Sequence, residues 1–503
     1  MNPSRMQNQD KKFFFLILLF SLLIKGIITY SITIPNVDAI KYINAAREFS
    51  LGNFQEGIRL YPLPLYPFLI SCFHYIIPDW FRAAQILSWL PLVLTTIPLY
   101  HISKKLFDRQ AALWSIAAYS LAPKFNSYTS NALRDPLGLL FISMAILFAL
   151  RAFDTAAKKD FLLVSTFSLL AFLCRIETIF FPLFFIIFCL FLVFYDRDQR
   201  KPFLEGISLF IIIPLSFFVV LLLFAPQDFS FLVHQELFNK HLHALMKSNY
   251  LANYYQLYDH LDSFSTSYTG NLLETAKHYM WFIYLIAIVE TAVKLLFHTN
   301  VIPLFFKGYE KYNKNTYFIL GIIILFTGTT YLNLVYKNLL AKRYLIIPVF
   351  LLFPWVGKGL DSLYGMARSG KIFGNYKQLV IACFMLIFIV CPFSKTLTLI
   401  GEKNLSLKYA SKWFEQHIDD EKEVRLLSND VRIPFLSGIE QKNFLYRKKL
   451  KHLESYALRH EANMLVLMIS KKKKQLIPEF RYYEVLKEFY DQDNIVIITG
   501  KKN

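Results

Sequence analysis

The chain has 503 residues, a formal net charge of +19 and a mean hydropathy of +0.38, and 55% of its residues are hydrophobic. This composition excludes an ordinary pair of soluble domains and indicates an integral membrane protein. The positive charge does not indicate nucleic-acid binding, because the Lys and Arg residues lie mainly in short runs between apolar segments, where they encode membrane topology.

Apolar segments long enough to span a bilayer recur along most of the chain. The first, residues 13–34, follows Lys11 and Lys12. It is too long for the apolar core of a signal peptide and has no small-residue cleavage site, so it predicts a retained span. Ten further spans are predicted at 82–102, 111–124, 136–153, 161–174, 178–195, 206–225, 276–297, 316–335, 343–357 and 378–397.

Alternate connections between these spans are short and basic, which sets their orientation. The residues concerned are Arg5, Lys11, Lys12, Lys104, Lys105, Arg109, Lys158, Lys159, Arg197, Arg200, Lys201, Lys307, Lys311, Lys314, Lys358, Arg368, Lys371 and Lys377. Basic connections stay in the cytoplasm, so we expect a cytoplasmic N-terminus. With an odd number of spans, the tail is predicted to be extracytoplasmic.

The tail has the pattern of a small soluble α/β domain. An amphipathic helix is predicted over 405–417, with Trp413 and Phe414 on its apolar face, and short strands at 424–428, 463–468 and 494–499. None of the five cysteines lies in the tail, and their spacing indicates neither a disulfide framework nor a zinc site. The predicted division is therefore a transmembrane module, 1–399, and an α/β domain, 400–503.

The long outer loop 35–80 contains the first candidate catalytic residue. Apolar residues at helical spacing over 38–49 predict a helix on the membrane surface, and Pro62, Pro64 and Pro67 redirect the chain into a second juxtamembrane stretch. Asp38 stands at the start of the first helix, next to the bilayer. It is a candidate catalytic carboxylate or, alternatively, a helix N-cap.

Two further sites carry charge where the bilayer makes charge costly. Arg134 and Asp135 stand at the outer end of the fourth span, and Arg175 and Glu177 in the tight outer turn after the fifth. Ionisable residues at such depth pair with one another or mark a substrate path. Structural pairs, Arg134 with Asp135 or Arg175 with Glu177, are the alternative to a functional role.

A third signal opposes the topology rule. Lys337, Lys342 and Arg343 fall within the outer connection 336–343, on the side that should be poor in cations. Such a cluster is suited to binding an anion such as a phosphate, unless the predicted span number is wrong by one. The other long outer loop, 226–275, contains the pair His241 and His243, which is weak evidence for a metal.

Together these residues predict a membrane-embedded cavity, open to one face, that holds a carboxylate and several cations. A carboxylate can remove a proton from an acceptor hydroxyl or amine, and cations can hold a departing phosphate. This set of residues is suited to transferring a group from a phosphorylated lipid. It does not fit a simple pore.

The order of these features resembles the polytopic glycosyltransferases of the GT-C type, in particular the branch with bacterial aminoarabinose transferase and the protein O-mannosyltransferases. After a first span come Asp38, the text PLPLYPFLI, Arg82 and LFDRQAALWSIAAYSLAP. There follow Arg134, Asp135 and Pro136, then RYLIIP at 343–348, and a C-terminal domain that begins YASKWFEQHI. The resemblance covers nearly the whole chain and implies a GT-C-like helical membrane protein.

The resemblance implies a hexosyl- or pentosyltransferase that uses a polyprenyl-phosphate sugar on the outer face of a bacterial inner membrane. Its acceptor would be a lipid, a glycan or a protein. Asp38 and Asp135 are the predicted catalytic residues. The predicted substrate and lipid-phosphate contacts are Lys41, Tyr42, Arg134, Arg175, Glu177, Lys337, Lys342, Arg343 and Tyr344.

One departure from the family concerns a metal cofactor. Many relatives place a second acidic residue beside the first-loop Asp, whereas here Ala39 follows Asp38. This puts a divalent metal in doubt, and none is predicted. Two other functions stay open: a lipid-linked saccharide flippase or transporter, and a cell-surface polysaccharide ligase or polymerase. Against transport, the charges gather at the outer ends of the spans and no internal repeat is apparent.

Overall fold

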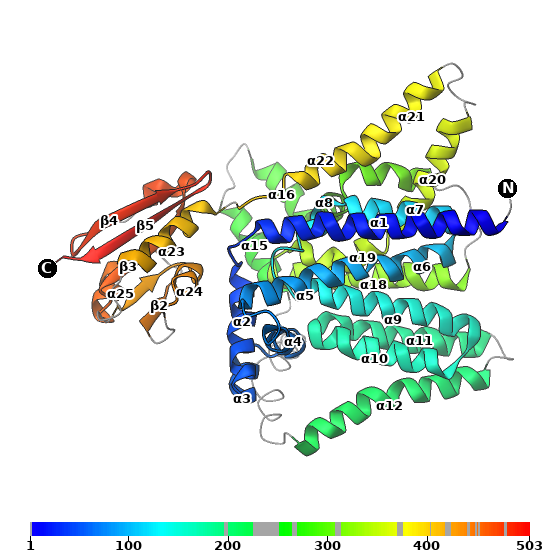
Figure 1. The fold of residues 1–503 in the computed structure, drawn as a ribbon, viewed down its shortest axis with the longest axis horizontal. Coiled ribbons are helices and arrows are strands. Elements are labelled where there is room, and N and C mark those ends of the chain that lie inside the picture. The colour runs from blue at the N-terminus through cyan, green and yellow to red at the C-terminus, as the bar shows by residue number, and fades with distance from the viewer. Residues whose placement is uncertain are drawn as a thin grey trace.

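The computed structural model shows a helical bundle with a small α/β domain at one end (Figure 1). We call this end of the bundle the domain end. The described residues are 3–195, 200–224, 251–263, 269–306, 313–369, 376–402, 404–417, 424–439, 443–447, 450, 453–476 and 480–502.

Seven helical segments in the described ranges are long and apolar enough to cross a membrane. They contain α1 (Pro3–Ser31), α5 (Trp80–Leu94) continued by α6 (Thr96–Leu106), α9 (Asp135–Thr155), η1 (Ile176–Ile179) continued by α11 (Phe180–Tyr195), α12 (Arg200–Phe224), α18 (Lys314–Lys337), and α21 (Lys377–Met385) continued by η5 (Leu386–Val390) and α22 (Cys391–Leu397). Phe15, Leu16 and Leu23 of α1 are more than half exposed, as expected of side chains that face lipid.

Two bent pairs raise the number of described spans to nine. One joins α16 (Gly270–His278) to α17 (Met280–Leu296) at 70°. The other joins η3 (Lys342–Leu345) and α19 (Ile346–Phe350) to α20 (Phe353–Ser369) at 55°. The apolar helices α7 (Arg109–Leu121) and α10 (Lys158–Cys174) are shorter but pack within the bundle, against α20 and α9. They lie at the spans predicted at 111–124 and 161–174, while seven to nine helical segments among the described residues are long and apolar enough to cross a membrane.

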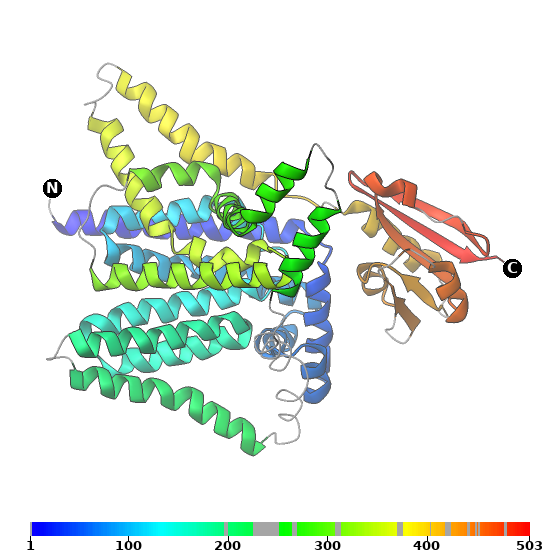
Figure 2. The ribbon, with the colours of Figure 1, turned by 180° about the vertical axis from the view of Figure 1, so that it is seen from behind.

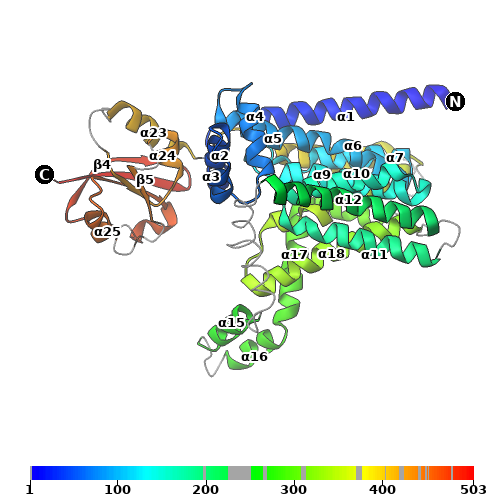
Figure 3. The same cartoon turned by 90° about the horizontal axis from the view of Figure 1, so that it is seen from below.

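The segment between α1 and α5 forms three short helices across the domain end: α2 (Val37–Ser50), α3 (Phe54–Leu60) and α4 (Leu65–His74) (Figures 1 and 3). This confirms the helix predicted over 38–49, whereas its place on the membrane surface stays a prediction. The N-cap is Asn36, whose Oδ1 accepts from the Ala39 N–H at 2.8 Å. The alternative that Asp38 is the N-cap is therefore wrong, because Asp38 lies in the first turn, with its carboxylate free for another role.

The C-terminal domain is a five-stranded sheet of order β2-β1-β3-β5-β4 with helices on both faces. The strands are β1 (Leu426–Ser428), β2 (Phe444–Tyr446), β3 (Met464–Ser470), β4 (Tyr483–Tyr490) and β5 (Asn494–Lys501). β1 is parallel to β2 and β3, whereas β5 is antiparallel to β3 and β4. α23 (Leu405–His417) and α24 (Arg432–Leu436) cover one face and α25 (Leu453–Arg459) the other.

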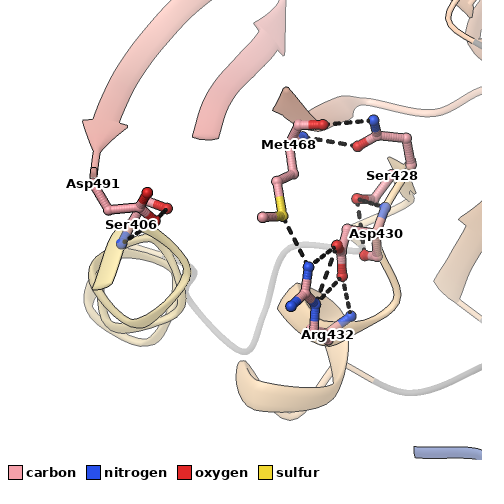
Figure 4. Close-up of polar contacts among 7 residues, drawn as sticks. Ser406, Ser428, Asp430, Arg432, Met468 and Asp491 are labelled. Atoms are coloured by element: carbon pink, nitrogen blue, oxygen red, sulfur yellow. Dashed lines mark hydrogen bonds and ion pairs between the residues drawn. The ribbon is translucent and has the colours of Figure 1, made fainter. Parts of the chain in front are cut away.

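At the carboxyl ends of β1 and β3, polar side chains of the domain bind to one another and to the backbone (Figure 4). The Asn429 side chain donates to the Met468 carbonyl at 2.9 Å and accepts from its N–H at 2.8 Å, as a further strand residue would. The Arg432 guanidinium binds both carboxylate oxygens of Asp430. These contacts fill the space where open sheets with parallel strands commonly bind ligands.

Polar contacts fix the domain to the end of α1. The carboxylate of Glu402 accepts from the backbone N–H of Thr33 at 2.8 Å and of Ile34 at 3.0 Å. At the start of α23, the Ser406 hydroxyl donates to Asp491 in the β4–β5 turn (Figure 4). Burial alone would raise the pKa of Asp491, but the hydrogen bonds that its carboxylate accepts, first among them the one from Ser406, hold that pKa below its ordinary value.

A cation–π contact joins the domain to α2. The guanidinium of Arg47 lies 5.2 Å from the ring centre of Phe435, in α24, and 5.8 Å from that of Trp80. The helix that carries Asp38 therefore contacts both the bundle and the domain.

Candidate active site

An ion pair at the domain end joins two residues that the sequence analysis had singled out separately. Asp38 from α2 and Arg343 from η3 are 305 positions apart, and Asp38 Oδ2 accepts from Arg343 Nη1 at 2.8 Å. Both side chains are 37% exposed. A pair at this depth is accessible to a substrate and yet partly shielded from water.

A second ion pair lies beneath the first and is buried. Arg175 and Asp135 are 4% and 3% exposed, and Arg175 Nη1 donates to Asp135 Oδ1. The same nitrogen donates to the backbone carbonyl of Arg343 at 3.0 Å. Arg175 therefore connects the start of α9 to η3, and so supports the backbone that presents Arg343.

Local sequence explains how Arg175 reaches this position. Arg175 is the extended C-cap of α10, whose helix ends there, so its side chain leaves the helix toward α9. A Cβ on Gly138 would lie 3.3 Å from the Arg175 side chain, which is a tight contact. The glycine leaves room for the arginine to pass.

Aromatic rings and Arg134 line the same region. Arg134 Nη1 donates to the Cys174 carbonyl at 2.9 Å, and its guanidinium lies 5.3 Å from the centre of the Tyr61 ring. Tyr61 contacts Tyr42 edge-on, with ring centres 4.7 Å apart. Burial, and then Tyr61, raise the pKa of Tyr42 well above its ordinary value, whereas Arg134 acts in the opposite direction. Tyr42 is therefore a neutral hydroxyl at neutral pH.

The charges of this cluster balance. Asp38, Asp135 and Glu177 supply three carboxylates, and Arg134, Arg175 and Arg343 supply three guanidinium groups. Glu177 lies 3.6 Å from Arg175 Nε, so one of the two structural pairs that the sequence left open is present. Arg175 also pairs with Asp135, whereas no ion pair of Arg134 with Asp135 is recorded among the described residues. Asp135 Oδ2 is buried and accepts no hydrogen bond from any described residue.

Four predicted contacts lie on the same side but outside this cluster. Lys41, Lys337 and Lys342 are exposed, and no ion pair is recorded for them among the residues that the structure describes. The Tyr344 carbonyl accepts from Thr330 at 3.2 Å, and its side chain is half-buried. A role for these four residues stays a prediction.

The sequence analysis did not select Tyr61, Tyr66 or Tyr128 as site residues. Tyr66 packs edge-on against Tyr42 at 5.2 Å and donates to the Ala84 carbonyl at 2.9 Å. Tyr128 is buried, and this burial raises the pKa of its hydroxyl; Asp135 raises that pKa further, whereas Arg175 and Arg343 lower it. The signal for the first two was the tyrosine and proline text LYPLPLYPFLI, whereas nothing in the local sequence marks Tyr128.

The possible metal ligands His241 and His243 lie outside the described residues. Within the described ranges, no group of three or more His, Cys, Asp or Glu side chains is placed to hold a metal ion.

One family model matches part of the chain. Residues 61–224 match the family model described as dolichyl-phosphate-mannose-protein mannosyltransferase. That range includes Arg134, Asp135 and Arg175 but neither Asp38 nor Arg343. No curated protein matches by sequence.

The solved structures that resemble this fold include two transferases. ArnT from Cupriavidus metallidurans, bound to undecaprenyl phosphate, has a TM-score of 0.56 and 12% identity, over 96% of this chain and 97% of that one. The archaeal oligosaccharyltransferase AglB from Archaeoglobus fulgidus, in complex with an inhibitory peptide and a dolichol-phosphate, has a TM-score of 0.52 and 11% identity. The match covers 93% of this chain and 71% of that one.

The chain is therefore an integral membrane protein with the GT-C fold. The resemblance to polytopic GT-C glycosyltransferases that the sequence predicts is confirmed by the family model and by the fold of ArnT and AglB.

Proposed function

We propose that this protein is a membrane glycosyltransferase that transfers a sugar from a polyprenyl-phosphate donor to an acceptor. The observation that carries the proposal is the ion pair of Asp38 and Arg343, half-exposed at the domain end and supported by the buried pair of Arg175 and Asp135. A base and a phosphate-binding cation thus lie within one hydrogen bond of each other.

The reaction requires two actions at one sugar carbon. The acceptor hydroxyl or amine attacks the anomeric carbon while the bond from that carbon to the phosphate oxygen breaks. Asp38 takes the proton of the acceptor, and Arg343 stabilises the negative charge on the departing polyprenyl phosphate. The products are the glycosylated acceptor and free polyprenyl phosphate.

Donor binding would also prepare the base. A guanidinium binds phosphate through strong, charge-assisted hydrogen bonds, so the donor phosphate competes with Asp38 for Arg343. When Arg343 turns to the phosphate, the Asp38 carboxylate is released to accept a proton. In this proposal Asp135 and Glu177 act by holding Arg175. Tyr42 and Arg134 lie beside them.

Lys41, Lys337 and Lys342 are exposed at the same end, and we assign them to the lipid phosphate and neighbouring headgroups, with Tyr344 beside Arg343. We place the protein in the bacterial cytoplasmic membrane, with a cytoplasmic N-terminus and an extracytoplasmic domain that begins near residue 400. The charge distribution along the connections supports this orientation.

Mass spectrometry of the products tests the proposal. Purified protein is incubated with a panel of polyprenyl-phosphate sugars and an extract of its own membranes. We expect free polyprenyl phosphate and an acceptor heavier by one sugar. Transfer of a whole glycan block with release of pyrophosphate would instead indicate a ligase. Intact donor that only changes leaflet in liposomes would indicate a flippase.

Replacing Arg343 tests the phosphate contact. In Arg343→Gln we expect the KM for the donor to rise about 30-fold, because one charge-assisted contact contributes roughly 2 kcal/mol. Arg343→Lys should be intermediate, since it keeps the charge but loses the fork of donors. Initial rates over a range of donor concentrations measure both.

The matched control is Arg59→Gln, which removes an exposed arginine of α3 that pairs with Glu56. An unchanged donor KM in Arg343→Gln would exclude Arg343 from the phosphate site.

A further inference from the structure

The loop that presents Arg343 is fastened at its other end by a side chain with no assigned role. We call residues 336–343, between the last turn of α18 and η3, the cation loop. Asn338 is the C-cap of α18 and has a φ of +50°. Its N–H donates to the Leu334 carbonyl at 2.8 Å, which ends the helix.

Three side-chain hydrogen bonds tie the cation loop to two other helices. Asn338 Nδ2 donates to the backbone carbonyl of Asn253, in α15 (Ala252–Asp262), at 2.6 Å. Asn253 Nδ2 donates in return to the Tyr336 carbonyl at 2.6 Å. From α17, the Tyr284 hydroxyl donates to Asn338 Oδ1. Asn338 therefore uses both atoms of its amide.

Asparagine suits both demands of this position. It enters the left-handed region more readily than other residues with a Cβ, and its amide offers one donor and one acceptor. Glycine would adopt the same backbone but would make none of the side-chain bonds. α15, whose Asn253 makes two of these bonds, lies at the domain end and packs against α18 and α16 (Figures 2 and 3).

These bonds bear on Arg343, which follows Asn338 by five residues. The bundle holds the far end of the loop, where Arg175 donates to the Arg343 carbonyl. At the end next to α18, Asn253 contacts both Asn338 and Tyr336, and Tyr284 contacts Asn338. A loop held at both ends keeps the guanidinium near Asp38 before the donor arrives, which lowers the ordering cost of binding.

We propose that Asn338 is a positioning residue that, together with α15, holds the cation loop for the donor phosphate. This inference rests on the proposed function for its consequence, but the fastening itself can be measured without any transfer. It assigns to α15 the task of shaping the phosphate site.

Two variants separate the backbone conformation from the side-chain bonds. Asn338→Gly keeps the positive φ and loses both amide contacts, whereas Asn253→Ala loses only the donation to Tyr336. We expect Asn338→Gly to raise the donor KM about tenfold with kcat changed less than about threefold, and Asn253→Ala to raise it about threefold. Asn271→Ala, an exposed change on α16, is the control.

Amide hydrogen exchange of the purified variants gives a readout that does not depend on activity. In Asn338→Gly, peptides covering 336–345 should exchange faster, while those covering 314–330 in α18 stay as in the parent protein. If Asn338→Gly exchanges faster but the parent protein itself transfers no sugar, the role of Asn338 in holding the loop is supported. Only the proposed function is then contradicted. Parent-like exchange and KM in Asn338→Gly would overturn the inference.

Discussion

Asp38→Asn is expected to lower the rate of sugar transfer by at least about 100-fold, because general base catalysis by a positioned side chain contributes 100- to 10,000-fold. The substitution keeps the size of the side chain. The amide oxygen can still accept from Arg343, which the carboxylate now binds at 2.8 Å. The change therefore removes the base without opening a cavity.

The donor should still bind to this variant. In the parent protein the Asp38 carboxylate competes with the donor phosphate for Arg343, and an amide competes less well. We therefore expect the KM for the donor to stay equal or to fall. Single-turnover transfer, together with binding of polyprenyl phosphate to the purified variant, measures the two effects separately.

Glu48→Gln is the matched control, since Glu48 lies on the same helix and its carboxylate accepts from Asn53 in an exposed contact. Parent-like turnover in Asp38→Asn would exclude Asp38 as the base. A loss of both transfer and donor binding would instead point to a structural role.

The sequence was sufficient to predict elements whose boundaries depend on local chemistry. The surface helix expected over 38–49 is Val37–Ser50, and the amphipathic helix expected over 405–417 has the same bounds in the structure. Both begin and end where apolar spacing and turn residues change. The three strands predicted in the tail are β1, β3 and β5, each with a run of apolar residues.

The two strands that were not predicted lack that signal. β2 has three residues, Phe444–Tyr446, and β4 reads YEVLKEFY, with most of its side chains exposed on an edge of the sheet. Their place comes from hydrogen bonds to β1 and β5, which are contacts between distant segments. Local patterns do not encode such partners.

The pairing of charges in the site could be predicted from local sequence only in part, since Arg175 does contact its neighbour Glu177 at 3.6 Å. Neighbours along the chain suggested Arg134 with Asp135, but adjacent residues on a helix point in different directions. Asp135 instead pairs with Arg175, which lies 40 positions away at the end of α10. The sequence marked residues that the structure brings together, because charge near the bilayer is rare, but the partners depend on how α9, α10 and η3 pack.

Arg175→Met is expected to destabilise the protein by about 3–5 kcal/mol, because it leaves the Asp135 carboxylate buried without its cation. Transfer should also fall, since the Arg343 carbonyl loses its donor from Arg175. Thermal unfolding of the purified protein in detergent measures the first effect, and donor-dependent rates on the folded fraction measure the second.

A double variant separates stability from positioning. In Arg175→Met with Asp135→Leu, the buried pair is removed as a whole, and Glu177, whose side chain is 34% exposed, loses its contact with Arg175. We therefore expect most of the lost stability to return, as replacing buried ion pairs by apolar residues often allows. The Arg343 carbonyl still lacks its donor from Arg175, so transfer should stay low. Recovery of transfer along with stability would mean that the buried pair serves the fold alone. Failure to recover either would show that Asp135 has a task of its own, for which its unbonded Oδ2 is available.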